Sequence, residues 1–283
     1  MNIQIISVPY DSGHKGTRTG QGPEHFLHKG VDQILRELGH QVRTFQINSS
    51  DSLTTEIGTT FTLNRLLAEK INSAVSNKMF PIVLAGNCNS CVGTIAGIGQ
   101  SQLGIIWLDA HGDFNTPETT ITGFLDGMGL AMAAGRCWKS ILKTIPGFTP
   151  VNESNIIHIG SRSLDIEEER QLKQSQIEII TPHEKESDTL KEVAAALKKL
   201  KNRVERIYLH VDIDVLDTGD ALPSYLAVPG GLTVDVIEEI IKMIKEKFEI
   251  SAGSITSFDP AYDKDDRVLY AGIRIIKSMV SAN

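Results

Sequence analysis

Two kinds of apolar pattern alternate along the chain. Short, nearly continuous apolar runs are typical of buried strands, whereas apolar residues at every third or fourth position are typical of amphipathic helices. Strands are predicted over 3–8, 41–45, 80–85, 103–108, 156–159, 177–180, 206–211 and 254–258. Helices are predicted over 23–38, 63–75, 127–134, 234–247 and 268–280, with two more that begin at 165 and at 181, the latter ending near 201.

This alternation predicts an α/β fold. Strands that alternate with helices and are apolar along their whole length form a mainly parallel sheet covered by helices on both faces. No linker rich in proline or serine, no repeat and no low-complexity tract interrupts the pattern, so we expect one domain over 1–283. Ligands bind at the carboxyl ends of strands in open parallel sheets. The expected sites therefore lie just after Ala85, Leu108, Val211 and Phe258.

Composition narrows the class of protein. The chain has 28 basic and 35 acidic side chains, a formal net charge of −7. This balance argues against nucleic acid or an anionic membrane as a partner, because both require a basic face. Three cysteines are too few for a disulfide scaffold and are expected to be reduced thiols. The chain also lacks a signal-peptide pattern and a membrane-length apolar stretch, so we expect a cytoplasmic protein.

Acidic residues directly follow two of the predicted strands. Asp109, His111 and Asp113 follow the strand that ends at 108, and Asp212 and Asp214 follow the strand that ends at 211. Residues two apart on a strand share a face, so the side chains of each set can converge. Converging carboxylates repel one another unless a cation is present, and oxygen ligands with one imidazole suit Mn²⁺, Mg²⁺ or Fe²⁺. Aspartates also cap strand ends and helices without a metal, but two such sets favour a two-metal hydrolytic centre.

Further motifs accompany these two sets, and together they resemble the ureohydrolase family of arginases, agmatinases and formiminoglutamases. The DAHxD and DxDxxD motifs of that family stand here over 109–113 and 212–217. Its NTPxT, IGxRxxDxxE, GGLT and GP motifs are matched over 115–119, 159–168, 230–233 and 20–23. The resemblance spans about residues 3 to 280 and implies the three-layer α/β arginase fold.

The resemblance also implies a role for each acidic residue. It implies two Mn²⁺ ions per chain, with Asp109 and Asp212 bridging them, Asp113 on the first ion, and His111 and Asp214 on the second. A hydroxide between the ions would attack the carbon of an amidine or guanidine and expel an amine. Asp109 and His111 are thereby placed in the catalytic centre. Members of the family assemble as trimers or hexamers, so we expect a homo-oligomer.

One departure from the family concerns the first ion. The histidine ligand in the family's GGDHS motif aligns with Cys88. A thiolate is a softer ligand than imidazole, so the first ion is expected to bind weakly, to be absent, or to be Zn²⁺ or Fe²⁺ instead of Mn²⁺. The alternative is that Cys88 is a small buried residue in a site that holds one ion. Cys91 lies three residues on, which leaves a redox pair open.

Two further departures concern the substrate. Asp126 stands where the family has a proton-shuttling histidine, so it would act as an acid or base with a raised pKa, bind a cationic substrate, or cap a helix. Ser257 stands where arginases and agmatinases have the glutamate that grips the guanidinium, and Asp259 is a candidate substitute two residues later. By the same resemblance, Asn115 and Thr122 occupy positions that contact the α-carboxylate of an amino-acid substrate.

Two hypotheses follow. The first is a metal-dependent hydrolase of linear amidine or guanidine C–N bonds, with a small guanidino or amidino amino acid as substrate. Cys88 together with HGDFNTPETT resembles the branch of the family that hydrolyses hydroxyarginine to hydroxyurea, which makes hydroxyarginine a candidate. The second is a catalytically impaired protein of the same fold that binds one metal or a small ligand in a regulatory role, because Cys88, Asp126 and Ser257 all depart from the family. His210, two residues before Asp212, is the best candidate to support a metal ligand.

Overall fold

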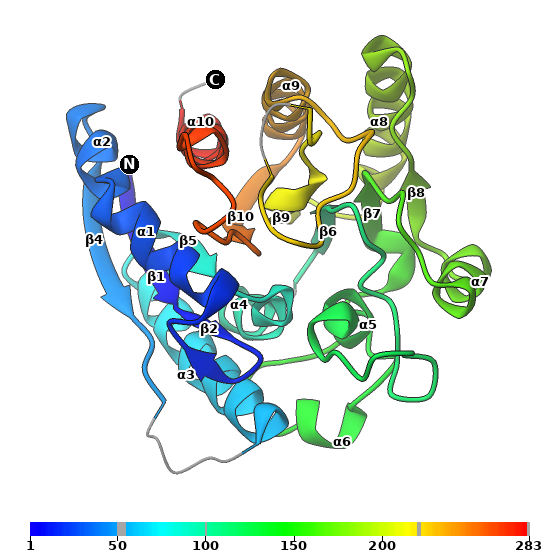
Figure 1. The fold of residues 1–283 in the computed structure, drawn as a ribbon, viewed down its shortest axis with the longest axis horizontal. Helices are drawn as coiled ribbons and strands as arrows, with labels where there is room; N and C mark the ends of the chain where they lie inside the picture. The colour runs from blue at the N-terminus through cyan, green and yellow to red at the C-terminus, as the bar shows by residue number, and fades with distance from the viewer. Residues whose placement is uncertain (50–54, 100, 220–221, 282–283) are drawn as a thin grey trace.

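A parallel sheet of eight strands forms the middle of the molecule in the computed structural model, which describes residues 1–49, 55–99, 101–219 and 222–281 (Figure 1). The strands are β1 (Asn2–Val8), β4 (Gln41–Gln46), β5 (Phe80–Ala85), β6 (Leu103–Leu108), β7 (Ile156–Ile159), β8 (Glu178–Ile180), β9 (Arg206–Asp212) and β10 (Glu249–Thr256). Their order is β4-β1-β5-β10-β9-β6-β7-β8, and every neighbouring pair is parallel. A separate hairpin joins β2 (Tyr10–Asp11) to β3 (His14–Lys15). The parallel sheet predicted from the apolar pattern is thus confirmed.

Helices cover both faces of this sheet and complete three layers (Figure 1). They are α1 (Gly22–His28), α2 (Val31–Glu37), α3 (Glu56–Ser76), α4 (Cys91–Ile98), α5 (Gly129–Ala133), α6 (Lys139–Leu142), α7 (Ile166–Gln174), α8 (Glu186–Leu200), α9 (Val234–Lys245) and α10 (Arg267–Val280). One apolar core packs under α1, α2, α8, α9 and α10, and a second packs under α3, α4 and α5. Along β6, Ile106 and Leu108 point to the first core, and Ile105 and Trp107 point to the second. Burial on both faces is the reason that the central strands are apolar throughout.

The structure corrects the bounds of two predicted helices. The helix predicted over 23–38 is broken into α1 and α2 at Gly30, whose φ of 81° is a left-handed conformation that ends the first helix. The helix predicted from 181 begins later, at Glu186, and Pro182 disfavours a helical backbone at Thr181, the residue before it. Neither α4 nor the β2–β3 hairpin is predicted by the apolar pattern.

Three other elements differ in extent. α3 begins earlier than expected, at Glu56, where the side chain of Thr55 caps the helix. The strand predicted over 254–258 ends before Ser257, whose φ of 64° is left-handed and breaks the extended backbone. The helix predicted over 127–134 is a 3₁₀ turn followed by the short α5.

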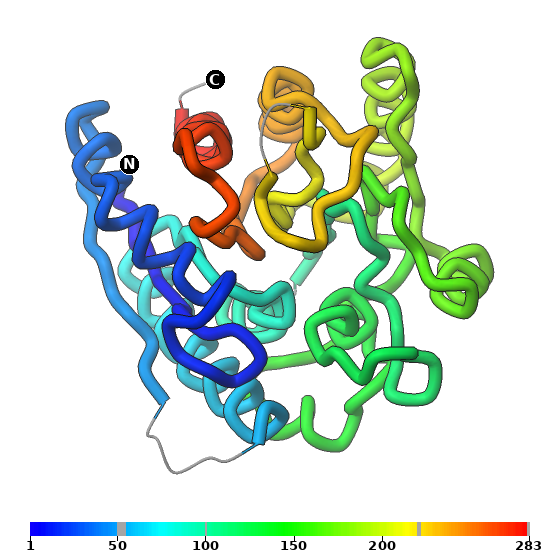
Figure 2. The backbone as a smooth tube through the Cα atoms, in the orientation of Figure 1, coloured from blue at the N-terminus to red at the C-terminus, as the bar shows by residue number. Residues whose placement is uncertain are grey.

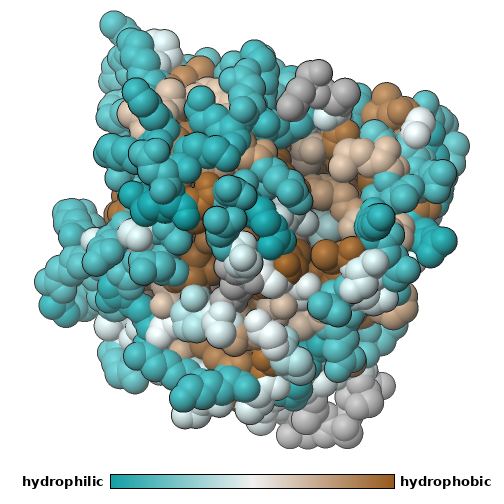
Figure 3. Space-filling view, turned by 180° about the vertical axis from the view of Figure 1, so that it is seen from behind, coloured by the Kyte–Doolittle hydropathy of each residue, from teal (hydrophilic) through white to brown (hydrophobic). Residues whose placement is uncertain are grey.

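Polar side chains are prominent on the face drawn in Figure 3. The side turned away from the viewer in Figure 1 is mostly hydrophilic, with hydrophobic residues showing between polar ones (Figure 3). Among the exposed large hydrophobic side chains, Leu222, Tyr225 and Leu226 fall within one loop. In the ranges that the structure describes, no helix combines the length and apolar character needed to cross a membrane.

Four adjacent strands, β5, β10, β9 and β6, end at the same edge in the middle of the sheet. The polar sets predicted to bind metal follow β6 and β9, which are direct neighbours. The segment after β9, yellow in Figure 2, lies beside the green segment after β7 at this edge, and hydrogen bonds join the two. The topology therefore collects residues from distant parts of the chain at one place.

Candidate metal centre

Side chains from three strand ends meet in two groups that share Asp109. The first group is Cys88, Asp109 and Asp212, and the second group is Asp109, His111 and Asp214. Within each group the candidate ligand atoms lie within 4.8 Å of one another. Cys88 starts the turn after β5, Asp109 and His111 follow β6, and Asp212 ends β9. The sheet thus brings together Cys88 and Asp212, which are 124 positions apart in the chain.

In the second group, His111 is held between two carboxylates. Its Nδ1 lies 3.0 Å from Asp214 Oδ2 and 3.6 Å from Asp109 Oδ1. Burial lowers the pKa of His111, but hydrogen bonds to the two carboxylates outweigh it and raise the pKa to about 12. Burial alone would raise the pKa of Asp214, yet its contact with His111 lowers it. The imidazolium thus acts as counter-ion to the carboxylates, a role that a divalent ion would take over.

In the first group, carboxylates and a thiol are buried together. Cys88 donates its S–H to Asp212 Oδ2 at 2.9 Å, and Asp109 Oδ2 accepts a hydrogen bond from Trp107 Nε1 at 2.9 Å. Burial and the charge of Asp214 raise the pKa of Asp109 to about 6 and also raise the pKa of Asp212. Burial and the charge of Asp212 raise the pKa of the Cys88 thiol. Carboxylates whose ionisation is this costly fit a site built around a cation.

Asp113, expected as a ligand of the first ion, belongs to neither group but lines the same cavity. It is buried, and its Oδ2 has no hydrogen-bond partner. Its φ of 48° is a left-handed conformation that is uncommon for a residue with a side chain. Burial and the charge of Asp109 raise its pKa. An unpaired buried carboxylate oxygen is costly, and a divalent ion nearby would offset that cost, so the residues present fit such an ion.

A cavity of about 260 Å³ opens onto both groups. The expected site residues that line it are Cys88, His111, Asp113, Asn115, Thr122, Asp126, Asp212, Asp214 and Ser257. Asp109 lies beneath them and is fully buried. Phe124, Tyr225 and Leu226 add apolar surface, and no lysine or arginine of the described chain belongs to the lining. The cavity is therefore suited to a cationic ligand.

The structure separates the two candidates for gripping a guanidinium. Ser257 lines the cavity, and its Oγ lies 3.5 Å from Cys88 Sγ. Asp259 is absent from the lining, and its carboxylate accepts a hydrogen bond from the backbone N–H of Ala261 at 3.0 Å. The expectation that Asp259 shares a face with Ser257 fails because the left-handed backbone at Ser257 ends the two-residue alternation of the strand.

Asp126 holds the loop that carries Cys88. Its Oδ2 accepts a hydrogen bond from Asn87 Nδ2 at 2.7 Å, and its Oδ1 accepts one from the backbone N–H of Asn89 at 2.9 Å. No side-chain capping bond forms in the turn that Asp126 begins, so the structure does not support the helix-cap interpretation. Burial raises the pKa of Asp126 to about 8 despite these hydrogen bonds. A carboxyl group that keeps its proton near neutral pH meets one condition for a general acid.

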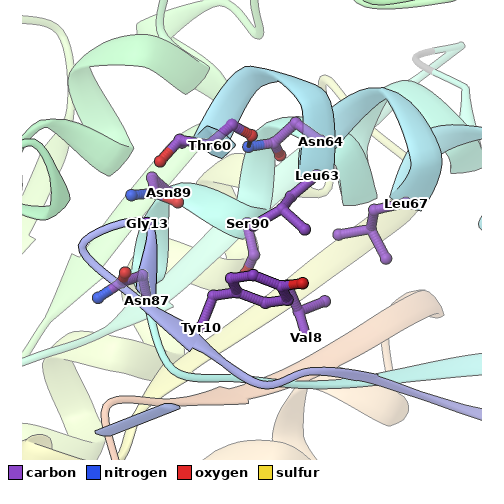
Figure 4. A pocket seen from close by; sticks show the side chains of 10 residues that line it. All are labelled: Val8, Tyr10, Gly13, Thr60, Leu63, Asn64, Leu67, Asn87, Asn89 and Ser90. Atoms are coloured by element: carbon purple, nitrogen blue, oxygen red, sulfur yellow. Dashed lines mark hydrogen bonds between the residues drawn. The ribbon is translucent and has the colours of Figure 1, made fainter. Parts of the chain in front are cut away.

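A second, much smaller pocket lies behind the same loop (Figure 4). Its volume is about 10 Å³, and its lining includes Asn89 and Ser90 from the loop and Thr60 and Asn64 from α3. Figure 4 shows Ser90 next to the ring of Tyr10, with Asn89, Thr60 and Asn64 drawn above it. Asn89 Nδ2 and Ser90 Oγ are buried without a hydrogen-bond partner, so the pocket suits one water molecule and no larger ligand.

His210 lies beneath the centre and reaches both groups through other residues. Its ring stacks on Trp107, with centroids 3.6 Å apart, and Trp107 binds Asp109. Its Nε2 lies 3.4 Å from Thr256 Oγ1, which in turn lies 3.0 Å from Cys88 Sγ. His210 is expected from the sequence to support a metal ligand, and it contacts the candidate ligands only through Trp107 and Thr256. Trp107 and Thr256 were not singled out from the sequence, although Trp107 lies two residues before Asp109 on the same face of its strand.

Arg162, which the sequence marks only as part of a motif, fixes the loop after β9. Its guanidinium bridges the segments that follow β7 and β9, because its hydrogen bonds run to main-chain oxygens of both. The acceptors are the carbonyl groups of Gly160, Asp214, Val215, Leu216, Val228 and Pro229. Since Asp214 is among them, Arg162 positions a member of the second group.

Arg162→Lys is expected to lower the free energy of unfolding by about 2–3 kcal/mol, because one ammonium cannot reach the carbonyl groups that the planar guanidinium spans. The exposed Arg170 of α7, which pairs with Glu167, provides the matched control, and Arg170→Lys is expected to change stability by less than about 0.5 kcal/mol. Urea unfolding of both variants measures the difference. Equal losses in the two variants would contradict the role assigned to Arg162.

Comparisons with known proteins agree with this fold. A model described as the arginase family matches residues 1–281. An arginase of Bacillus subtilis (strain 168) is 27% identical and one of Bacillus caldovelox is 29% identical, each over 98% of this chain and 97% of that protein. The crystal structure of arginase from Bacillus cereus covers 100% of this chain and 99% of its own, with a TM-score of 0.90 and 26% identity. A formimidoylglutamase from Bacillus subtilis shares the fold, with a TM-score of 0.77 and 19% identity over 98% of this chain and 85% of that one.

Proposed function

The chain belongs to the arginase family, and on that premise we propose that it is a metal-dependent hydrolase of a guanidino or amidino C–N bond. The observation that carries the proposal is the pair of side-chain groups that share Asp109 under a cavity lined by carboxylates. We further propose a small amino-acid-like substrate, with hydroxyarginine as the first candidate.

The proposed metal centre holds two Mn²⁺ ions per chain, or one if Cys88 does not serve as a ligand. Cys88, Asp109 and Asp212 would hold one ion, and Asp109, His111 and Asp214 the other. Asp113, whose buried Oδ2 is unpaired, is proposed as a further ligand. Divalent ions bound there would lower the pKa of a water molecule and so supply the hydroxide that attacks the substrate carbon.

The protein's own residues would bind and orient the substrate. The carboxylate-lined cavity attracts a cation, which fits a guanidinium or amidinium group. Asn115 and Thr122 are proposed to bind an α-carboxylate; Asn115 also donates a hydrogen bond to Asp165 at 3.1 Å in the same cavity. Asp126, with its pKa raised to about 8, is proposed to give a proton to the leaving amine.

Ser257 favours a modified guanidine over arginine itself. A serine in the place of the family's glutamate offers a hydroxyl group without charge, so it gives a guanidinium no ionic partner. The hydroxyl of hydroxyarginine is a donor and an acceptor, which Ser257 can match. The proposed products are hydroxyurea, or urea from an unmodified guanidine, and an amine that keeps the amino-acid end.

The test is a substrate screen with Mn²⁺ present, using arginine, hydroxyarginine, agmatine and formiminoglutamate. Turnover of hydroxyarginine above arginine is the expected result. Metal-loaded protein that hydrolyses none of the four would instead support the alternative, a catalytically impaired arginase-family protein that binds one metal or a small ligand in a regulatory role. The observation that favours this alternative is that Cys88, Asp126 and Ser257 stand where the family has two histidines and a glutamate.

Ser257→Glu is expected to shift the preference from hydroxyarginine toward arginine, because it returns a carboxylate to the cavity wall near the first group. The ratio of the two kcat/KM values measures the shift and is expected to change at least about 10-fold, the effect of 1.4 kcal/mol in differential binding. Ser224→Glu adds a carboxylate elsewhere in the same cavity and serves as the control. A ratio that moves equally in both variants would show only a general charge effect.

We also propose, from the family resemblance, that the protein acts in the cytoplasm as a homo-oligomer, a trimer or a hexamer. Light scattering coupled to size-exclusion chromatography measures the assembly, and a monomer at working concentrations would contradict it.

A further inference from the structure

We infer that the two metal positions select different ions: the first group takes a thiophilic divalent ion such as Zn²⁺ or Co²⁺ through Cys88, whereas the second group takes a hard ion such as Mn²⁺. This inference rests on the proposed metal centre but concerns the identity of its ions. It assigns Cys88 the role of a ligand and not that of a space-filling residue.

The first observation is the position of the Cys88 sulfur. It is buried, 2.9 Å from Asp212 Oδ2, 3.0 Å from Thr256 Oγ1 and 3.5 Å from Ser257 Oγ. Two ligands of one ion at bond lengths of about 2.0–2.3 Å lie roughly 3–4 Å apart, so the sulfur is already near the spacing of a ligand beside Asp212. Thr256 offers a hydroxyl group that can donate to a thiolate once the S–H proton has left.

The second observation is that the loop holds the sulfur in place before any ion binds. On one side of Cys88, the Asn87 side chain accepts a hydrogen bond from the Ser12 N–H at 2.9 Å and donates one to Asp126. On the other side, the Asn89 N–H also donates to Asp126. The backbone on both sides of Cys88 is therefore held by contacts outside the metal centre, which lowers the entropic cost of using its sulfur as a ligand.

The third observation is the unpaired Oδ2 of Asp113, which is buried and lines the same cavity. Hydrogen bonds stabilise the carboxylates of the two groups, but none reaches this oxygen. A bound cation would therefore be its partner. With Asp113, the first position offers one sulfur and carboxylate oxygens, whereas the second offers one imidazole nitrogen and carboxylate oxygens. Thiolate ligands select Zn²⁺, Co²⁺ and Fe²⁺ over Mn²⁺, and oxygen-rich sites with imidazole accept Mn²⁺.

Cys91 provides an internal contrast. It is also fully buried, but its S–H donates to the carbonyl oxygen of Gly129 at 3.4 Å, and it belongs to neither group. The two cysteines therefore differ in their neighbours and not in burial. Binding of an ion at the first position would release the thiol proton of Cys88 to solvent and leave Cys91 protonated.

The experiment loads chelator-stripped protein with Co²⁺ and records its absorption spectrum and its cobalt content per chain. A thiolate bound to Co²⁺ gives an intense charge-transfer band in the near ultraviolet, which oxygen and nitrogen ligands do not. The wild type and Cys91→Ser are expected to show this band, and Cys88→Ser is expected to lose it. Protein dialysed against Mn²⁺ in large excess over Zn²⁺ is expected to retain one of each per chain, whereas Cys88→His is expected to retain Mn²⁺ at both positions.

Two results would overturn the inference. One is wild-type protein that binds two cobalt ions per chain without the charge-transfer band, because both ions then lack a sulfur ligand. The other is a single cobalt ion without the band, which would show Cys88 to be a protonated thiol beside one occupied position. Turnover in the substrate screen is scored separately, so hydrolysis without the band would reject this inference alone, and metal binding without hydrolysis would reject the proposed function alone.

Discussion

Asp109→Asn is expected to remove divalent ions from both positions and to abolish turnover. Asp109 is the residue that the two groups share, and it is fully buried beneath the cavity. Asparagine keeps the shape of the side chain but removes the charge that offsets the two ions, and it leaves a buried amide among ligands. Removal of a residue that only hydrogen-bonds to a metal ligand already lowers metal affinity about 10- to 100-fold. Removal of the ligand that the two positions share is therefore expected to lower it more than about 100-fold.

Asp217→Asn is the matched control because Asp217 belongs to the same sequence motif as Asp212 and Asp214. Its carboxylate lies outside both groups and accepts hydrogen bonds from backbone N–H groups of Gly219, Gly230 and Gly231. This variant is expected to keep its metal. Elemental analysis after dialysis against Mn²⁺ and Zn²⁺ measures the ions per chain. Equal metal content in Asp109→Asn and Asp217→Asn would remove the basis of the metal centre.

The candidate ligands that the sequence places at strand ends are residues that the structure brings close together. Asp109 and His111 directly follow β6, and Asp212 ends β9 just before the 3₁₀ turn that carries Asp214, so the ends of two neighbouring parallel strands place all four residues at one edge of the sheet. Cys88 is singled out by the family resemblance, and its place just after β5 agrees with the site expected after Ala85. The positions of these residues can therefore be predicted from the apolar pattern of the strands and the spacing of polar residues after them.

Residues that depend on irregular backbone are not predictable in this way. The left-handed conformation of Ser257 turns Asp259 away from the cavity, and no periodic pattern contains that information. The same is true of Gly30, which divides one predicted helix into two. Contacts between loops are equally unpredictable from residue spacing. The hydrogen bonds from the Cys88 loop to Asp126, and those from Arg162 to main-chain carbonyl groups, join segments that come together only in the complete fold.

Protein stripped of divalent ions is expected to become less stable as the pH rises from 6.5 to 8. Burial raises the pKa of Asp126 to about 8, and burial with neighbouring carboxylates raises the pKa of Asp113 and Asp212. These folded-state groups keep protons in this window that the unfolded chain, with ordinary carboxyl groups, has already lost. His111 adds to the effect, because its pKa rises to about 12 while an unfolded histidine loses its proton near 6.5. Stability therefore falls as these protons are removed.

The lower limit of this pH range, 6.5, is chosen because two buried histidines change stability in the opposite direction at lower pH. Burial lowers the pKa of His158 to about 4 and lowers that of His210, so the unfolded chain binds more protons than the folded one at these residues below pH 6.5. Their contribution makes stability rise with pH and fades above about 6.5, because an unfolded histidine is half protonated at that pH and nearly neutral about one unit higher. Towards pH 8 the carboxyl groups and His111 therefore dominate the profile.

Each proton held by the folded state and not by the unfolded state lowers stability by about 1.4 kcal/mol per pH unit, so the slope is expected to be at least about 1.4 kcal/mol per unit. Urea unfolding with a chelator present, at intervals from pH 6.5 to 8, measures the slope. Asp126→Asn removes one titrating group and is expected to flatten it. Added divalent ions are expected to stabilise the protein more at pH 8 than at pH 6.5, because they supply the positive charge that the lost protons no longer provide. A flat or rising profile in the chelator would mean that these buried carboxylates are already balanced without a cation, and the electrostatic case for the metal centre would fail with it.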